Sequence, residues 1–239
     1  MKLRFTGLTD PGLVRSRNQD AYHIDPLGRF VIVADGMGGH AGGEEASRIA
    51  TQGIQAYLVE HWDSVKTSSA LLEGAFLQAN QAILQDQENN PQRSDMGTTA
   101  VVVIFREKQP YCAHVGDSRL YRLRSSLQRL TEDHTWVARA LKLGDITPDE
   151  ARSHQLRHIL SRCLGREDLD QIDVQALDVQ PGDRLLLCSD GLTEELSDQL
   201  IAFHLQSNQA VEQAVVALIK AAKDKGGRDN ITVVLVAID

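Results

Sequence analysis

Apolar residues along the chain follow two patterns, helical spacing and short continuous runs. Helical spacing occurs at residues 46–58, 72–83 and 211–222, where apolar positions recur every three or four residues. This spacing gathers the apolar side chains on one face and predicts three amphipathic helices. The third is expected to end at Gly226 and Gly227, because glycine favours the backbone conformation that closes a helix.

The continuous apolar runs are short and rich in β-branched residues, which predicts buried strands. The predicted strands are residues 29–34, 98–105, 111–115, 118–123, 184–189 and 231–238. They come in succession rather than alternating with helices, so the expected fold class is α+β, with helices on the outer faces of the sheets. No Pro- or Gly-rich linker and no repeat divides the chain, which favours a single domain.

Residues 133–170, called the flap segment below, differ from their surroundings. They are more polar, with short helical patterns and no strong strand pattern. From Arg139 to Arg166 there are six lysines and arginines against three acidic residues, in a chain with 33 acidic and 25 basic residues. We expect an insertion beside the core, whose cations either recognise phosphoprotein surfaces or are ordinary solvated charges.

Composition narrows the class of protein. Hydrophobic residues make up 42% of the chain and charged residues 24%, as in ordinary globular proteins. The net charge of −8 argues against non-specific nucleic-acid binding, which needs clustered cations. No apolar run approaches the roughly 20 residues that span a bilayer, and no apolar segment of a secretory signal follows the N-terminus. We therefore expect a cytoplasmic monomer without nucleic-acid or membrane partners.

Candidate chemistry lies in aspartates at the ends of predicted strands or in tight turns. They are Asp35, Asp117, Asp190 and Asp229, with Asp20 just before a further short strand. Oxygen ligands suit Mg²⁺ and Mn²⁺, whereas three widely spaced cysteines without a paired motif disfavour zinc. Each Asp-Gly pair taken alone is most often an ordinary turn, and spacing does not show whether these carboxylates converge.

The glycine-rich stretch after the first predicted strand allows a second interpretation. Residues 36–41 fit G-x-G-x-x-A, a variant of the dinucleotide-binding fingerprint. However, Asp35 would place a carboxylate beside the pyrophosphate, and the second strand with an acidic end that this fold requires is missing. The metal site is the favoured interpretation.

Six short motifs in order resemble those of the metal-dependent protein phosphatases, the type 2C serine/threonine phosphatases, in their minimal bacterial form. The motifs are RSRNQD at 15–20, ADGMGG at 34–39, MGTT at 96–99, VGDSR at 115–119, CSDGL at 188–192 and GRDN at 227–230. The resemblance covers nearly the whole chain. It implies one catalytic domain over residues 1–239, folded as a four-layer α-β-β-α sandwich of two antiparallel sheets with a flap near the site.

The resemblance also implies a metal centre of two Mn²⁺ or Mg²⁺ ions. Asp35 would bridge the two ions, and Gly36 would offer its carbonyl to one of them. Asp190 and Asp229 would complete the shell of the other ion, and Asp20 would act nearby through a bound water. The ion pair would activate a water for in-line attack on phosphoserine or phosphothreonine in a protein substrate.

Three further residues receive roles beside this centre, that of Asp117 from the resemblance and those of Arg15 and His40 from their chemistry and place in the sequence. Asp117, together with the aspartate at 190, would hold a weaker third ion. Arg15 would bind the phosphate, since a guanidinium offers two parallel donors. His40 either protonates the leaving alkoxide or simply orders its glycine-rich loop, whereas the flap histidines His154 and His158 are expected to be surface residues.

Two departures from the family pattern concern the proton donor and one metal contact. Gln19 stands where many members have glutamate, and Met37 stands where animal members have a histidine proposed as the general acid. The metal aspartates and Arg15 are all present, which favours an enzyme over two alternatives. These are a non-catalytic pseudophosphatase that binds partners and a phosphatase of small phosphorylated molecules.

Overall fold

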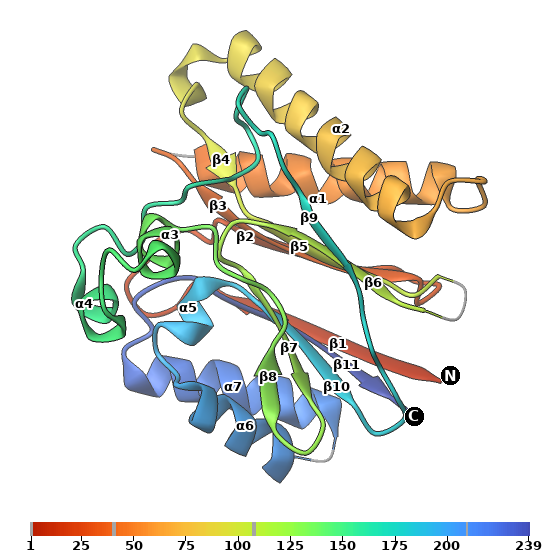
Figure 1. Ribbon diagram of the computed structural model, residues 1–239, viewed down its shortest axis with the longest axis vertical. Helices are drawn as coiled ribbons and strands as arrows, with labels where there is room; N and C mark the ends of the chain where they lie inside the picture. Colours follow the sequence, from red (N-terminus) through yellow and green to blue (C-terminus); the bar gives the residue numbers. More distant parts are fainter. Residues whose placement is uncertain (1, 40–41, 107–108, 209) are drawn as a thin grey trace.

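The structure is a computed structural model that describes residues 2–39, 42–106, 109–208 and 210–239. Two antiparallel sheets lie face to face, and helices cover the outer face of each (Figure 1). Successive strands pair through short turns, while the helices pack on the outside, so the apolar faces of both kinds of element are buried. This confirms the α+β four-layer sandwich expected from the sequence.

The first sheet contains both ends of the described chain. Its strands are, in spatial order, β1 (Leu3–Asp10), β11 (Ile231–Ile238), β10 (Arg184–Cys188), β7 (Arg119–Leu123) and β8 (Leu127–Arg129). β1 and β11 pair over their full length, with Leu3 opposite Ile238 and Asp10 opposite Ile231. β11 is buried at every residue, as expected for a central strand covered on both faces.

The second sheet carries the glycine-rich motif. Its main path is β2 (Asp20–Ile24), β3 (Phe30–Met37), β5 (Ala100–Ile104), β6 (Tyr111–Val115) and β9 (Asp173–Ala176), and β4 (Gly97–Thr98) pairs with the end of β3. Predicted strand 98–105 is thus divided at Thr99, which lies between β4 and β5. The chain passes from this sheet to the first one through the turn between β6 and β7.

Helices cover the two outer faces, as Figure 1 shows. The second sheet is covered by α1 (Gly42–His61) and α2 (Ser68–Asn89), which is followed by the short η1 (Pro91–Arg93). The first sheet is covered by α5 (Asp190–Thr193), α6 (Asp198–Ser207) and α7 (Val211–Lys225). None of the helices in the described ranges combines the length and apolar character needed to cross a membrane.

Side-chain alternation along the strands divides the core into layers. On β3, Phe30 and Ile32 pack under α1 and α2. Val31 and Val33 point the other way, into the layer between the two sheets, where they join Leu187 of β10 and other apolar side chains of both sheets. The outer layer under α7 forms a third apolar cluster.

The elements missed in the sequence have weak hydrophobic patterns. β1 is half-exposed along its length, with no buried residue, so its apolar positions do not form a continuous run. β9 has two half-buried and two exposed residues. α6 buries only Ile201 and Leu205. Each of these elements is defined by its pairing or packing partner more than by its own sequence.

The flap segment lies beside the sandwich and carries α3 (Trp136–Leu143) and α4 (Pro148–Ser153). Thr135 caps the start of α3, and Gly144 ends it in the left-handed conformation. No strand of either sheet falls between residues 133 and 170, all of which have a described backbone. Only Ala140 of α3 is buried, so this helix contributes little to the core.

Replacement of Leu187 by alanine tests the layer between the sheets. Leu187 is fully buried there, so Leu187→Ala should lower the free energy of unfolding by about 2–5 kcal/mol through lost burial and a residual cavity. Urea denaturation of the metal-free protein measures this value. Leu77→Ala on α2, where the leucine is 54% exposed, is the matched control and should stay within about 0.5 kcal/mol of wild type. Equal effects of the two changes would contradict the proposed core.

Candidate metal centre

Five predicted aspartates converge at one end of the sandwich. Asp20 and Asp35 lie opposite each other on β2 and β3. Asp190 begins α5 directly after β10, Asp229 lies two residues before β11, and Asp117 occupies the turn between β6 and β7. Each sheet therefore contributes two of these side chains, and Asp117 lies where the chain passes between them. Spacing along the sequence could not show this convergence; the fold produces it.

The electrostatics of these carboxylates confirm that they act on one another. For Asp35 and for Asp190, burial raises the pKa well above its usual range, and the surrounding carboxylates raise it further. Burial also raises the pKa of Asp20 to about 6 and that of Asp117 to about 7. Several carboxylates held close together without a cation resist ionisation. A hard divalent cation would remove that repulsion, and the all-oxygen donor set suits Mg²⁺ or Mn²⁺.

Hydrogen bonds hold only one of the two carboxylate oxygens of Asp20. Its Oδ2 atom accepts hydrogen bonds from Ser189 Oγ at 2.7 Å and Thr232 Oγ1 at 2.6 Å. Its Oδ1 atom is buried and has no hydrogen-bond partner. A buried carboxylate oxygen without a donor is costly, so this atom fits a site for a cation or for a water bound to one.

The backbone at Gly36 is packed too closely for any side chain. A Cβ atom there would lie 1.9 Å from the carbonyl oxygen of Gly43 and 2.6 Å from that of Gln19. The Gly36 amide also donates to the Gln19 carbonyl at 3.1 Å. Glycine is required here by close packing of backbone on backbone, which explains why the Asp-Gly pair is more than an ordinary turn.

The MGTT motif fixes the backbone of Asp35. Thr98 Oγ1 donates to the Asp35 carbonyl at 2.8 Å, and the Thr99 amide donates to the same oxygen at 2.9 Å. The Asp35 amide donates to Thr99 Oγ1 at 3.0 Å, and the Thr99 hydroxyl lies 2.7 Å from Ser118 Oγ. Thr99 therefore connects Asp35 with the turn that carries Asp117. Sequence analysis gave these threonines no separate role, although the motif contained them.

Arg15 and Asp229 form an ion pair at the edge of the centre. Arg15 Nη2 lies 2.7 Å from Asp229 Oδ2, and the guanidinium side chain is 53% exposed. Asn230 donates from its amide to Asp229 Oδ1 and from its side chain to the Arg17 carbonyl. The loop that carries Arg15 is thus tied to the Asp229 turn, while about half of the Arg15 side chain remains exposed.

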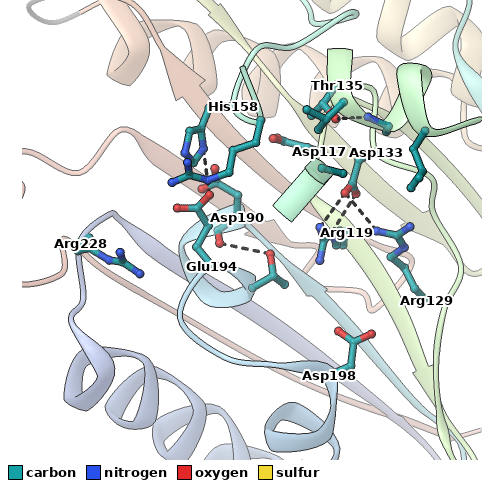
Figure 2. Close-up of a pocket in the computed structure, with 16 residues that line it drawn as sticks. Asp117, Arg119, Arg129, Asp133, Thr135, His158, Asp190, Glu194, Asp198 and Arg228 are labelled. Carbon is teal, nitrogen blue, oxygen red and sulfur yellow. Dashed lines mark hydrogen bonds and ion pairs between the residues drawn. The ribbon is translucent and has the colours of Figure 1, made fainter. Parts of the chain in front are cut away.

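A pocket of about 740 Å³ opens beside these carboxylates and is drawn in Figure 2. Asp117 and Asp190 reach it from the sandwich, and His158 reaches it from the flap segment. His158 Nδ1 lies 2.9 Å from Glu194 Oε1. Ligand atoms of His158, Asp190 and Glu194 lie within 4.8 Å of one another. His158 is an exposed residue, as expected, and the flap fold also brings its side chain to the site, a position that the sequence did not indicate.

The remaining sequence predictions concern His40, Gln19 and the three cysteines. His40 lies outside the described residues. Gln19 Nε2 lies 3.5 Å from the Gly38 carbonyl, so its side chain is directed to the glycine-rich loop. Cys112, Cys163 and Cys188 are buried free thiols. Among the described residues, no cysteine belongs to a candidate metal cluster.

Comparison with known proteins agrees with this site. The family described as Protein phosphatase 2C matches residues 14–235. Serine/threonine protein phosphatase PstP of Mycobacterium tuberculosis is 37% identical over 237 residues, which cover 98% of this chain but 44% of PstP. Serine/threonine phosphatase stp of Listeria monocytogenes is 36% identical over 244 residues, which cover 97% of this chain and 94% of that protein. The chain thus spans less than half of one relative and nearly all of the other.

Solved structures of the first relative have the same fold. The crystal structure of the M. tuberculosis phosphatase has a TM-score of 0.90 at 37% identity, over 99% of both chains. A structure of the PstP catalytic domain in complex with two manganese ions has a TM-score of 0.85 at 36% identity, again over 99% of both chains. With its matching motifs, fold and converged aspartates, this chain belongs to the protein phosphatase 2C family.

Proposed function

We propose that this chain is a metal-dependent serine/threonine protein phosphatase, with residues 1–239 forming one catalytic domain. One observation supports this most strongly. Carboxylates from both sheets converge on a site where a buried oxygen of Asp20 has no partner, directly beside an exposed guanidinium. A divalent cation centre next to a phosphate-binding arginine is the requirement for metal-assisted phosphate ester hydrolysis. The relatives named serine/threonine phosphatases support the same activity.

The proposed metal ligands follow from their places around the centre. Asp35 and the Gly36 carbonyl, at the end of β3, would hold two Mn²⁺ or Mg²⁺ ions together with Asp190 and Asp229. Asp20 would contribute through a water, because only its Oδ1 atom is free. When bound, the two ions would supply a nucleophilic water near neutral pH and positive charge for the transition state.

A weaker third ion is proposed on the pocket side of the centre. Asp117 and Asp190 both line the pocket and would be its carboxylate ligands. His158 and Glu194 lie close to Asp190 and are within reach of the same position. These two residues pair with each other at 2.9 Å, so ion binding there would compete with an existing contact and would be weak.

Arg15 would orient the phosphate. One of its terminal nitrogens is bonded to Asp229, which restricts the direction of the side chain, and its remaining N–H groups can donate to phosphate oxygens. His40, the residue proposed as general acid in the sequence, keeps that role as a proposal.

The substrate is proposed to be a phosphorylated protein rather than a small molecule. The relative named a serine/threonine protein phosphatase supports this substrate class. The pocket of about 740 Å³ beside the centre, lined by acidic, basic and apolar side chains, has room for more than the phosphate group alone. The pseudophosphatase alternative gains no support from the site, since the predicted aspartates and Arg15 all lie at the centre.

The first prediction concerns the metal aspartates. Hydrolysis of a phosphothreonine peptide should require Mn²⁺ or Mg²⁺ and stop with EDTA. Asp190→Asn should reduce kcat/KM on the order of a thousandfold, because several kcal/mol of transition-state stabilisation come from the cations. Asp198→Asn, a change of an exposed pocket residue bonded to Tyr121, is the matched control and should retain activity within about threefold. Activity that persists in EDTA would reject the metal mechanism, and a folded metal-loaded protein without activity would favour a binding protein over an enzyme.

The second prediction separates phosphate binding from metal binding. Arg15→Ala should raise KM for the phosphopeptide about tenfold or more, with Mn²⁺ affinity equal to or slightly above wild type, since Asp229 loses its competing cation. Calorimetric Mn²⁺ titration and steady-state kinetics measure the two effects. Arg17→Ala, an exposed arginine 3.9 Å from Glu44, is the control. A fall in Mn²⁺ affinity as large as that of Asp190→Asn would place Arg15 among the groups that support the metal instead.

The third prediction concerns pH. Asp20 and Asp117 have pKa values raised to about 6 and about 7, so protons compete with cations below that range. A group whose pKa is raised in the folded state stabilises the fold at low pH, and this stability is lost as the pH rises through the raised pKa. Bound cations restore the lost stability. The increase in Tm caused by Mn²⁺ should therefore grow from about pH 6 to about pH 8. Thermal unfolding with and without Mn²⁺ measures this difference. An increase independent of pH would show that these carboxylates do not bind the ion.

A further inference from the structure

His134, at the start of the flap segment, makes paired contacts with Gly116 that the proposed mechanism does not use. Its backbone amide donates to the Gly116 carbonyl at 3.0 Å. Its ring accepts a hydrogen bond at Nδ1 from the Gly116 amide, with 3.2 Å between the nitrogens. Both backbone polar groups of Gly116 are therefore bonded to one residue, and His134 is 6% exposed.

These contacts determine which ring nitrogen carries the proton. A backbone N–H can only donate, so Nδ1 of His134 must be the unprotonated nitrogen. The neutral ring is then protonated at Nε2, which lies 3.2 Å from Asp173 Oδ2 on β9 and donates to it. Arg162 Nη1 donates to the other oxygen, Asp173 Oδ1, at 3.1 Å and also lies 3.4 Å from His134 Nε2. Asp173 Oδ2 is the nearer partner of Nε2, and the Gly116 N–H at Nδ1 leaves Nε2 as the protonated nitrogen. Asp173 thereby orients the ring, as a carboxylate does for a histidine in many active sites.

The same geometry argues against a second metal site in this place. Ligand atoms of His114, His134 and Asp173 lie within 4.8 Å of one another, and His114 Nδ1 is buried without a partner. However, a metal at His134 Nε2 would require the proton to move to Nδ1, where it would face the Gly116 N–H. The two rings are also stacked, with centroids 4.6 Å apart and planes 22° apart, so their in-plane lone pairs run side by side instead of converging.

Gly116 matters because its carbonyl belongs to the peptide bond that leads into Asp117. The glycine has φ of 102°, and a Cβ atom there would lie 2.5 Å from Thr99 Cγ2, so the turn is tight as well as left-handed. A residue that holds both sides of Gly116 fixes the plane of the following peptide. It thereby fixes the direction from which Asp117 enters the pocket.

The flap segment is attached to the same histidine. The Ser161 amide donates to the His134 carbonyl at 2.8 Å, and the Trp136 amide donates to the Ile159 carbonyl at 2.8 Å. Arg162, one residue farther along the flap, reaches the oxygen of Asp173 that His134 leaves free. Residues 159–162 of the flap segment, the ring of His134 and the Asp117 turn are therefore joined by hydrogen bonds into one unit.

We propose that His134, held by Asp173 as the Nε2-protonated ring, is a positioning residue that fixes Asp117 for the weaker cation and couples that site to the flap segment. The proposal rests on the proposed function of Asp117. It assigns His134 no contact with substrate or with the reacting atoms. Its structural part, the bond from Gly116, exists without any metal and can be tested alone.

The wild-type protein tests the tautomer directly. Long-range ¹H–¹⁵N correlation spectra of the metal-free protein should show His134 unprotonated at Nδ1 and protonated at Nε2. The Gly116 amide should exchange slowly with solvent, since it is buried and bonded. The opposite tautomer would overturn the proposal without affecting the proposed phosphatase activity.

Two substitutions test the two ring nitrogens of His134 separately. His134→Asn keeps an acceptor near the position of Nδ1, whereas His134→Gln keeps a polar group near Nε2 and loses that acceptor. In the metal-free protein, His134→Gln should speed Gly116 exchange about tenfold and His134→Asn by less than about threefold. In calorimetric Mn²⁺ titrations, His134→Gln should raise the dissociation constant of the weakest site about tenfold, with the two tighter sites unchanged in both variants.

His61→Asn is the matched control, because His61 is a part-buried histidine on α1 that stacks on Tyr57 and contacts none of these groups. In this variant, Gly116 exchange and weak-site Mn²⁺ affinity should both match wild type. Unchanged Gly116 exchange in His134→Gln would overturn the proposal while leaving the phosphatase assignment intact. Faster exchange with unchanged weak-site affinity would also overturn it, because the hydrogen bond would then not position Asp117. If His134→Asn behaved like His134→Gln, the Nδ1 acceptor would have no role.

Discussion

Repulsion between carboxylates at one end of the sandwich is the constraint on which this structure depends. Asp35 and Asp190 each have a pKa raised by burial and by the carboxylates around them. Such a site is unfavourable for the fold unless a cation occupies it. We propose that the rest of the centre holds these side chains for a pair of hard cations, and that the core of the sandwich provides the stability that opposes the repulsion.

The centre also joins the two sheets. Asp20 and Asp35 belong to the second sheet, and Asp190 and Asp229 flank strands of the first. Hydrogen bonds cross the same boundary, since Asp20 accepts from Ser189 and Thr232. Cations bound here would therefore connect the sheets, and the register of each sheet would control the geometry of the centre. Asp117 is different, because its turn is held by the flap segment through His134.

Much of the fold could be predicted from the sequence because its main elements have strong patterns. The runs that became β3, β10 and β11 are buried on both faces, and α1, α2 and α7 have clear apolar faces. β1 could not be predicted, since a half-exposed strand is defined by its pairing with β11. For the site, the residue types and their turns predicted that the aspartates are metal ligands, and the ordered family motifs predicted that these aspartates converge. The contact of His158 with Glu194 depends on how the flap folds, which no local pattern encodes.

We propose that Asp35, together with residues of both sheets, would hold two cations. Crystals grown with Mn²⁺ and measured at the manganese absorption edge test it most directly. The account predicts two strong anomalous peaks within ligand distance of Asp35, about 3.5 to 4 Å apart, with one of them also contacting Asp190 and Asp229. A single peak, or peaks that do not contact Asp35 in a fully occupied crystal, would contradict it.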